Sequence, residues 1–241
     1  MAKYSVIADL HCHTVASDHA YSTITELANA AAEKGLVAVG CTDHGTGIQD
    51  APHMWHFYNL DALPDTISGV RVLRGVEANV MDFAGRLDME DYVLDRLEIV
   101  VASMHDGVMP QGTVEQCTEA WLAVAHNPRV TIIGHSGQPQ FAYDYERVIP
   151  EFGRCGKAVE INAGTFHTRE EAVPNCRRIA LLCKQYGVPV MVDSDAHYHA
   201  SVGEVEPCLR MLEEIDFPPE LVLNGDRERL RRFLQGHGVK W

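Results

Sequence analysis

The sequence lacks the features that mark several common classes of protein. Its seven cysteines are an odd number without a CxxC pair, which argues against a disulfide framework and against a zinc site of four cysteines. No run of about 18 apolar residues occurs, so no membrane span is predicted. Neither a GxGxxG nor a GxxxxGK[ST] motif is present, and nucleotide binding of the Rossmann or P-loop type has no support.

Basic residues are also few. Twenty lysines and arginines stand against 34 acidic residues, and the formal net charge of -14 argues against a broad basic surface for nucleic acid or anionic lipid. The first residues lead into a short apolar run that Asp9 interrupts, so no signal peptide is expected. Together with the unpaired cysteines, this pattern predicts a cytoplasmic protein.

Short apolar runs and amphipathic segments alternate along the whole chain. Seven runs, most of them continuously apolar, are typical of parallel strands that are buried on both faces. They cover residues 4–10, 37–42, 70–75, 97–102, 130–133, 158–161 and 188–192. No linker or low-complexity segment separates them, so we expect a single α/β domain over residues 1–241, built either as a barrel or as a doubly wound open sheet.

Helix-capping patterns stand between these runs. Thr23 and Glu26 have the spacing of a capping box, and the helix that they predict ends at Gly35. The same spacing predicts two further helices, the second of which ends at Gly187, from the pairs Thr113 with Gln116 and Thr168 with Glu171. Two more helices are predicted over 204–215 and 226–235.

Histidine is the residue in excess, with 13 in 241 positions. Potential metal ligands follow six of the seven predicted strands, always at the carboxyl end: His11 and His13, His44, Glu77, His105, His135, and Asp195 with His197. In a closed parallel barrel these strand ends meet at one rim, where such folds place their chemistry. This convergence favours a barrel over an open sheet.

Local spacing supports a metal site at that rim. His11 and His13 are two residues apart on a strand, so both imidazoles project from one face while Cys12 points away. Asp195 and His197 repeat this spacing, and His19 lies close enough in the next loop to fold back over the rim. Side chains suited to hold ligating imidazoles by hydrogen bonds are Asp9, Asp43, Asp193 and Asn162.

Nine ligands are too many for one metal ion. A single zinc needs about three or four protein ligands, so two metals with a bridging carboxylate or three metals fit better. Imidazole-rich ligand sets favour Zn, Mn or Fe over Mg or Ca. The nine predicted ligands are His11, His13, His19, His44, Glu77, His105, His135, Asp195 and His197.

The motifs DLHCHT, SDH, TDHG, GVE, SMH, GH and DSDAH, in this order, resemble those of the PHP (polymerase and histidinol phosphatase) superfamily. Segments 50–57, 73–79 and 216–220 look like its stand-alone YcdX-like phosphatase branch. The resemblance covers essentially the whole chain. It implies a distorted seven-stranded, TIM-like β/α barrel, a centre of three divalent metals, commonly zinc, and a homotrimer.

The resemblance also implies how the nine ligands are shared among the three metals. His11, His13, Glu77 and Asp195 would hold one metal. Glu77 with His105 and His135 would hold a second and thus bridge the two. The third metal would be held by His19, His44 and His197.

The resemblance also implies phosphatase activity. We therefore expect hydrolysis of a small phosphate monoester by a metal-bound hydroxide, with no separate protein nucleophile. Three alternatives stay open: a phosphodiesterase or 3'-5' exonuclease at the same centre, an amidohydrolase barrel, and a non-catalytic metal-binding module. A nuclease would need a basic groove. An amidohydrolase typically has a strand-4 lysine where this chain offers His105.

Histidines outside the ligand set have weaker assignments. His53 and His56 lie on the active rim and are predicted to contact substrate or to pack their loop. His167 and His199 follow the sixth and seventh strands and have the same two readings.

Overall fold

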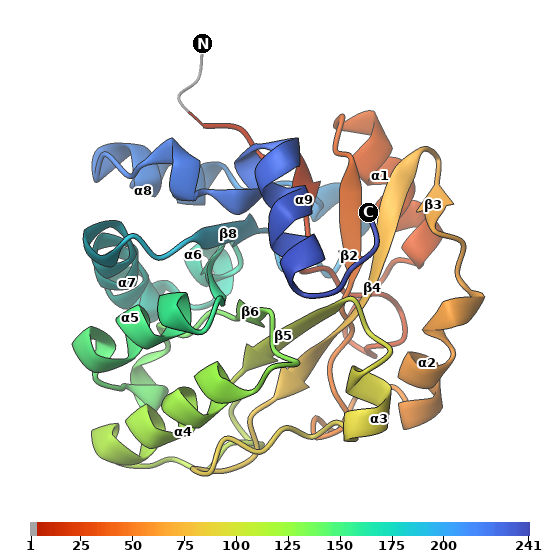
Figure 1. The fold of residues 1–241 in the computed structure, drawn as a ribbon. Coiled ribbons are helices and arrows are strands. Elements are labelled where there is room, and N and C mark those ends of the chain that lie inside the picture. Colours follow the sequence, from red (N-terminus) through yellow and green to blue (C-terminus); the bar gives the residue numbers. More distant parts are fainter. Residues whose placement is uncertain (1–3) are drawn as a thin grey trace.

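The computed structural model describes residues 4–241; residues 1–3, on which the expected absence of a signal peptide partly rests, lie outside them. Seven parallel strands form a nearly closed barrel with helices around it (Figure 1), which confirms the predicted α/β barrel. The neighbouring strands, in order, are β1 (Ala8–Asp9), β2 (Ala38–Cys41), β4 (Val70–Asn79), β5 (Ile99–Ser103), β6 (Ile132–Ile133), β7 (Ala158–Asn162) and β8 (Val190–Asp193).

The strands differ in length from the predicted runs. Only two residues of the run 4–10 form β1, and only two of the run 130–133 form β6. Strand β4 is longer than predicted and pairs with β5 as far as Asn79, so Glu77 lies inside the strand rather than after it. A short strand β3 (Thr66–Ile67), which was not predicted, forms an antiparallel hairpin with β4. Its turn residues Ser68 and Gly69 both have positive φ, as a two-residue hairpin turn requires.

The helices lie outside the barrel (Figure 1). They are α1 (Ile24–Glu33), α2 (Met54–Tyr58), α3 (Asp91–Leu94), α4 (Val114–His126), α5 (Tyr145–Arg154), α6 (Thr165–Thr168), α7 (Val173–Tyr186), α8 (Glu206–Glu214) and α9 (Arg227–Gly236). Short 3-10 turns cover 60–62, 139–141, 170–172, 199–201, 219–221 and 223–225. No helix within residues 4–241 is long and apolar enough to cross a membrane.

Two of the three predicted capping boxes are confirmed. Thr23 and Thr113 cap α1 and α4, each with a reciprocal side-chain bond from the third helical residue. The predicted box at Thr168 is wrong, because the Thr168 hydroxyl donates to the Gly164 carbonyl and ends α6. Helix α7 begins at Val173 instead, where Pro174 suits the first turn, and it ends at Gly187 as predicted.

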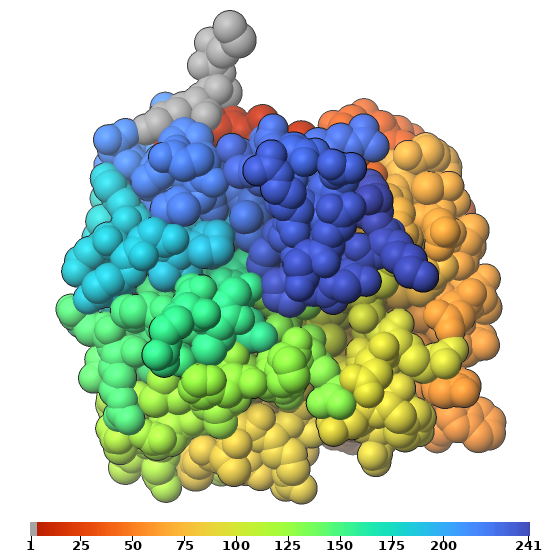
Figure 2. Space-filling model, in the orientation of Figure 1, coloured from red at the N-terminus to blue at the C-terminus, as the bar shows by residue number. Residues whose placement is uncertain are grey.

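Helix α9 closes the amino-terminal end of the barrel. Leu230 and Leu234 of α9 pack with apolar residues at the starts of the strands, including Ala38, Ile99 and Ala158. Figures 1 and 2 show the C-terminal segment lying across this face and filling it. The predicted site therefore lies at the opposite, carboxyl-terminal end, where TIM-like barrels place their functional residues.

Side chains join the barrel between its first and last strands. The Asn224 amide nitrogen donates to Ala8 O at 2.9 Å and to Val192 O at 2.7 Å, and its oxygen accepts from Val192 N at 3.1 Å. Farther along, Leu10 N donates to Asp193 Oδ1 at 2.7 Å, and Ser194 N donates to Asp9 Oδ1 at 3.0 Å. Among the described strands, these side-chain bonds hold β1 to β8 where a regular main-chain ladder stops.

We predict that Asn224→Ala lowers the free energy of unfolding by about 2–4 kcal/mol, because it removes three hydrogen bonds and leaves buried main-chain groups unpaired. Denaturant unfolding of the variant measures this loss. Asn29→Ala is the matched control, since Asn29 is exposed on α1 and bonds only to the Ser68 hydroxyl among the described residues. Equal stability of the two variants would contradict the role of Asn224.

Candidate metal centre

Five histidine rings surround the buried carboxylate of Glu77 at the carboxyl end of the barrel. Its Oε1 lies 2.8 Å from His135 Nε2, 3.3 Å from His105 Nε2 and 3.4 Å from His11 Nε2. Its Oε2 lies 2.8 Å from His44 Nδ1 and 3.6 Å from His13 Nε2. The Glu77 side chain has no solvent exposure. Glu77 therefore occupies a central position, from which its two oxygens face different groups of histidines.

Asp195 supplies a second carboxylate to the same cluster. Its Oδ1 lies 3.1 Å from His13 Nε2 and 3.7 Å from His11 Nε2. The φ angle of Asp195 is 59°, a left-handed conformation that non-glycine residues seldom adopt. Arg169 donates to Asp195 Oδ2 at 2.8 Å, and Asn162 does so at 3.2 Å. The strained backbone and these two bonds fix the carboxylate toward His11 and His13.

His19, His44 and His197 form a third group at the mouth of the barrel. His19 Nδ1 faces the Asp50 carboxylate, and His197 Nδ1 lies 2.9 Å from the Asp195 carbonyl oxygen. In neutral rings the proton sits on the nitrogen that faces an acceptor, so both Nε2 atoms carry lone pairs. These Nε2 atoms are 2.9 Å apart, and His44 Nε2 lies 3.3 Å from that of His19. Two acceptors that face one another, with a third imidazole nitrogen beside them, fit a cation or a shared proton.

The same reasoning applies beside Glu77. His11 Nδ1 lies 2.7 Å from Glu160 Oε1, and His105 Nδ1 lies 2.6 Å from Asn79 Oδ1. Asn79 is oriented in turn, because its amide nitrogen donates to Asp88 Oδ2 at 2.6 Å. With protons on Nδ1, the Nε2 lone pairs of His11 and His105 point at a carboxylate, an arrangement that places acceptors against acceptors.

Four buried atoms of this cluster make no hydrogen bond to the described residues: His11 Nε2, His13 Nδ1, His44 Nδ1 and Glu77 Oε2. The last two lie 2.8 Å apart, close enough for an ion contact but without the geometry of a hydrogen bond. Burying unpaired polar atoms is costly, and so many in one place point to a missing ligand. Imidazole nitrogens and carboxylate oxygens are donors that suit zinc and similar divalent metals. The residues present therefore fit a metal centre.

His135 is held differently from the other rings. Gln138 Nε2 lies 3.0 Å from His135 Nδ1 and also donates to the Met104 carbonyl oxygen. This contact favours the proton on His135 Nε2, where it is directed at Glu77. A metal at this nitrogen requires the Gln138 amide to turn its oxygen toward Nδ1.

Electrostatics keep most of the cluster in the form that binds metals. Burial and the neighbouring His44 lower the pKa of His13 to about 3, so this ring is neutral. Burial raises the pKa of Glu77, but His105, His11 and His44 outweigh it and hold this pKa well below its ordinary value. The pKa of Asp195 is likewise held low, against its burial, by His11, His13 and Arg169. Neutral imidazoles and ionised carboxylates are the ligating species.

The surroundings of His11 favour a positive charge at this position. Burial lowers the pKa of His11, but the carboxylates of Glu160, Glu77 and Asp195 raise it well above its ordinary value. The three carboxylates therefore stabilise positive charge at this position, either as a proton on the ring or as a metal cation.

The residues predicted to support the ligands lie in different places. Asn162 contacts Asp195, as described above. Asp43 accepts bonds from Thr14 N at 2.7 Å and Ser17 Oγ at 2.8 Å, and lies 3.2 Å from His56 Nε2, so it orders the loop between His13 and His19. Within residues 4–241 it has no hydrogen bond with the His44 ring, which was the expected partner. Asp9 and Asp193 join β1 to β8 and do not touch a ligating ring through a hydrogen bond in this part of the chain.

Several residues that hold the cluster were missed from the sequence. Glu160 bonds His11 and also accepts from His135 N at 2.7 Å. Its signal was an acidic residue inside the apolar run 158–161, because a buried strand holds an unpaired carboxylate only at a cost. Arg169 and Asp50 gave no such signal, since both lie in loops or short turns whose shape depends on the fold.

A cavity of about 740 Å³ opens over the cluster. Its lining includes His167, Thr168 and Arg169 beside seven of the nine predicted ligands: His19, His44, Glu77, His105, His135, Asp195 and His197. His11 and His13 lie beneath them with no solvent exposure.

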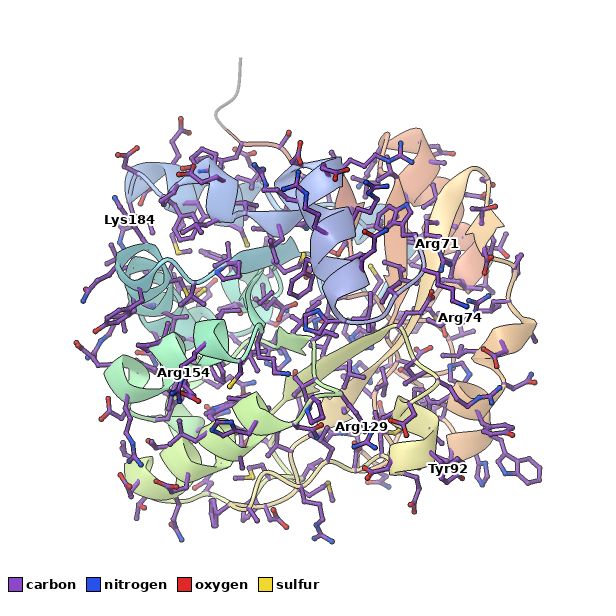
Figure 3. All side chains as sticks on the ribbon, in the orientation of Figure 1. Arg71, Arg74, Tyr92, Arg129, Arg154 and Lys184 are labelled. Carbon is purple, nitrogen blue, oxygen red and sulfur yellow. The ribbon has the colours of Figure 1, made fainter. Side chains whose placement is uncertain are left out.

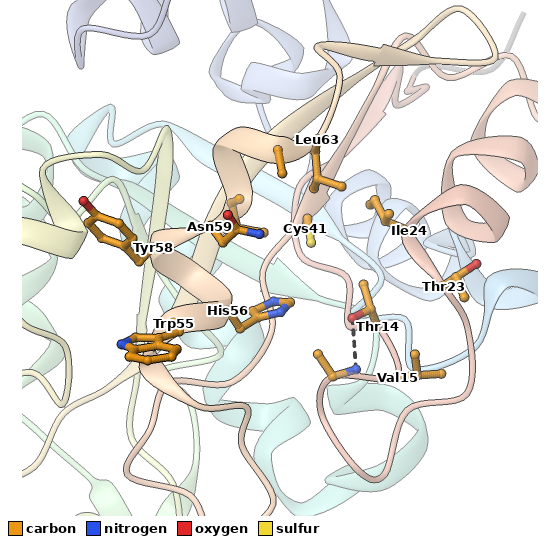
Figure 4. A pocket seen from close by; sticks show the side chains of 13 residues that line it. Thr14, Val15, Thr23, Ile24, Cys41, Trp55, His56, Tyr58, Asn59 and Leu63 are labelled. Carbon is orange, nitrogen blue, oxygen red and sulfur yellow. Dashed lines mark hydrogen bonds between the residues drawn. The ribbon is translucent and has the colours of Figure 1, made fainter.

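A second cavity of about 840 Å³ lies between α1 and α2 (Figure 4). It is largely apolar, and its walls include Val15, Ile24, Leu63 and Trp55. His56 lines this second cavity rather than the first, and His53 is an exposed cap of α2 that accepts from Trp55 N. The larger cavity thus lies apart from the cluster. The substrate contacts predicted for His53 and His56 stay predictions without support from this geometry.

His167 and His199, for which the sequence also suggested substrate contact, lie in different surroundings. His167 lines the cavity over the cluster. His199 instead holds a loop in place, since its Nδ1 lies 3.1 Å from the Ser22 hydroxyl.

Comparison with known proteins identifies the family of this chain. The family model for the PHP domain matches residues 9–164, which include seven of the nine predicted ligands. The chain belongs to the PHP domain family. A relative from Caldicellulosiruptor bescii, named "Probable phosphatase", is 42% identical and covers 95% of this chain and 96% of its own length. Another of that name, from Acetivibrio thermocellus, is also 42% identical and covers 95% of each chain.

Comparison with solved structures shows which known proteins share the fold of this chain. Histidinol phosphate phosphatase from Lactococcus lactis, complexed with zinc, L-histidinol and phosphate, aligns with a TM-score of 0.61 at 15% identity. The alignment covers 88% of this chain and 94% of that one. At this identity the likeness shows a shared PHP barrel fold. With the phosphatase relatives matching nearly the whole chain, the protein is a hydrolase of the phosphatase type within the PHP family.

We predict that Glu160→Gln weakens metal retention about 10- to 100-fold, because the neutral amide no longer stabilises the Nδ1 proton of His11 or adds negative charge. Metal content after dialysis against a graded chelator buffer measures the effect. Glu171→Gln, at an exposed position, is the control with the same chemical change. Unchanged retention in Glu160→Gln would show that Glu160 only fills space.

Proposed function

We propose that the protein hydrolyses small phosphate monoesters with three divalent metals, most simply zinc, with manganese or iron as the other candidates. The observation that carries the proposal is the convergence of nitrogen lone pairs and carboxylate oxygens at three adjacent places in the cluster. His11, His13, Glu77 and Asp195 would hold the first metal, Glu77 with His105 and His135 the second, and His19, His44 and His197 the third.

Distances within the cluster support the first group and overlap with the other two. The ligating atoms of His11, His13 and Asp195 lie within 4.8 Å of one another. The other sets this close are His44, Glu77 and His105, and His13, His44 and His197, and each shares two residues with the proposed second or third group. His44 and His13 each belong to two of these sets, so the sets are contiguous. A carboxylate with two differently directed oxygens, as in Glu77, suits a bridge between neighbouring metals.

Bound divalent metals would supply a nucleophilic water at neutral pH and would neutralise charge on the phosphoryl oxygens. In the overall reaction a water oxygen forms a bond to phosphorus, the bond from phosphorus to the ester oxygen breaks, and the alcohol leaves with a proton. The chain's own residues contribute position and charge. Arg169 lines the cavity with a guanidinium that Asp195 and Asn162 orient, and its Nε is buried without a partner among the described residues.

Nucleophilic catalysis by the nearby cysteine is disfavoured by its surroundings. Cys12 is fully buried and packs in the outer core, on the side away from the cluster. Burial and the carboxylates of Asp9 and Asp193 raise the pKa of the Cys12 thiol well above its ordinary value. A protonated thiol is a poor nucleophile, so direct attack by water is the simpler route.

A small monoester fits the surface charge better than a nucleic acid strand does. Four arginines labelled in Figure 3 are each paired with a carboxylate: Arg71 with Glu98, Arg74 with Asp65, Arg129 with Asp95 and Arg154 with Glu151. These arginines lie at the amino-terminal end of the barrel, away from the cluster. Arg169 is the only lysine or arginine among the described residues that line the cavity over the cluster, and a wall with one cation makes a weak track for a phosphate backbone. The neighbour from Lactococcus lactis, complexed with zinc, L-histidinol and phosphate, supports a substrate of similar size.

We predict that a chelator abolishes phosphate release from monoesters and that added Zn²⁺ or Mn²⁺ restores it. Glu77→Gln and His11→Ala should each lower kcat/KM by about 10²-fold or more, because each removes a group that faces several others in the cluster. Released phosphate and bound metal are measured together. His126→Ala, with an exposed ring outside the cavity, is the control.

Three results would contradict the proposal. Full activity of Glu77→Gln would remove the central role of this carboxylate. Turnover of a diester exceeding that of the matching monoester would favour the phosphodiesterase alternative. Metal binding without hydrolysis of either ester would favour the non-catalytic module.

A further inference from the structure

A second group of metal-ligating side chains lies beside the apolar cavity between α1 and α2, apart from the nine predicted ligands. It consists of Cys41 in β2, Asp43 two residues later and His56 in α2. One ligating atom from each lies within 4.8 Å of the other two. His56 Nε2 is 3.2 Å from Asp43 Oδ2, and Cys41 Sγ is 3.9 Å from the same oxygen. A thiol, an imidazole and a carboxylate therefore converge here.

The local backbone explains this convergence. The chain continues extended beyond β2 to a bridge between His44 and Glu77, so Cys41 and Asp43 project from one face. This is the outer face of the barrel, since Cys41 packs in the outer core. Helix α2 brings His56 to that face, and Figure 4 shows Cys41 and His56 lining one cavity. His44 turns to the opposite side, so the strand separates this group from the histidine and carboxylate cluster.

One nitrogen of the group lacks a hydrogen bond. His56 Nε2 is a buried atom that makes none to the described residues, although it lies near Asp43 Oδ2. That oxygen already accepts from the Thr14 hydroxyl at 2.8 Å. A buried polar atom without a hydrogen bond is costly and calls for an explanation. A cation held between His56, Asp43 and Cys41 supplies the missing partner.

The donor types indicate which metal fits. A thiolate beside an imidazole favours zinc and similar ions over Mg, Ca or Mn, which suit oxygen ligands. Three protein ligands leave the fourth position of a tetrahedral ion to water from the cavity. Burial and Asp43 raise the pKa of the Cys41 thiol well above its ordinary value, so the thiol keeps its proton without a metal. Metal binding forms the metal–sulfur bond and releases that proton to solvent.

A similar group at the surface lacks these supporting observations. His126, Glu151 and Cys155 also bring one ligating atom each within 4.8 Å of the others. The His126 side chain is 63% exposed, and Glu151 is already paired with Arg154. None of these residues has a buried atom without a partner in the described part of the chain. This surface group therefore serves as a control.

We propose that Cys41, Asp43 and His56 bind one further divalent metal of the zinc type, separate from the metals of the histidine and carboxylate cluster. The ion would join α2 to β2. It would also fix Asp43, which accepts from Thr14 N and Ser17 Oγ in the loop after β1. The proposal does not depend on hydrolysis of phosphate esters by the cluster, so the two are tested independently.

Cobalt distinguishes this site, because a bond between Co²⁺ and a thiolate gives a charge-transfer band in the near ultraviolet that nitrogen and oxygen ligands do not give. None of the nine predicted ligands of the other cluster is a cysteine. The full chain is stripped with a chelator and titrated with Co²⁺, and the spectrum and bound metal are recorded. We expect the wild-type protein to show the band and to bind one ion more than Cys41→Ser. His56→Gln should weaken the binding that produces the band at least about tenfold, because it removes a ligand.

Two controls separate metal binding at Cys41 from other effects. Cys155→Ser makes the same chemical change in the surface group and should keep the band. The visible absorption of Co²⁺ in the histidine and carboxylate cluster should be the same in Cys41→Ser, in His56→Gln and in the wild type, which shows that the variants fold.

Each outcome decides the proposal. Loss of the band in Cys41→Ser together with its retention in Cys155→Ser supports the site. A wild-type protein without the band overturns the proposal and leaves only a contact between His56 and Asp43. A band that survives in Cys41→Ser, or that disappears in Cys155→Ser, overturns the assignment to Cys41.

Discussion

The architecture depends on one electrostatic constraint: an anionic carboxylate, Glu77, is buried among imidazole rings whose lone pairs face one another. Without cations this arrangement is unfavourable, because acceptors oppose acceptors in a region that water does not reach. When divalent cations are bound, the same nitrogen and oxygen atoms serve as their ligands. Several surrounding residues hold these imidazole rings in position. Glu160, Asn79 and Asp50 each hold an imidazole Nδ1, which fixes which nitrogen turns inward.

The barrel supplies these side chains from both ends of the chain. His11 and His13 follow β1, and Asp195 and His197 follow β8, so the first and last strands must lie side by side. Asn224, Asp9 and Asp193 join them by side-chain hydrogen bonds, and one main-chain bridge pairs Cys12 with Ala196, where His13 N donates to the Ala196 carbonyl oxygen. Directly before this bridge the chain turns at Asp195, whose positive φ directs its carboxylate to His11 and His13.

The fold class and the ligand cluster could be predicted because both follow from a regular pattern. Continuous apolar runs indicated buried parallel strands, and ligand types at their carboxyl ends indicated one shared rim. Features that depend on tertiary contacts could not be predicted in this way. Glu77 lies within β4 because β5 pairs with it beyond the apolar run, and Thr168 ends a helix instead of starting one because its hydroxyl finds the Gly164 carbonyl. Arg169 reaches Asp195 only once α6 is in place.

Because α9 fills the amino-terminal end of the barrel, substrate and products must use the same opening. Leu230 and Leu234 fill the amino-terminal end of the barrel, so the cluster communicates with solvent through the opposite opening. In the proposed reaction the ester enters phosphate first, and both products leave by the way the substrate came. The alcohol, nearer the opening, departs before the phosphate that lies beneath it. Because the amino-terminal end is closed, the phosphate that lies deepest in the cavity would be the last product to leave.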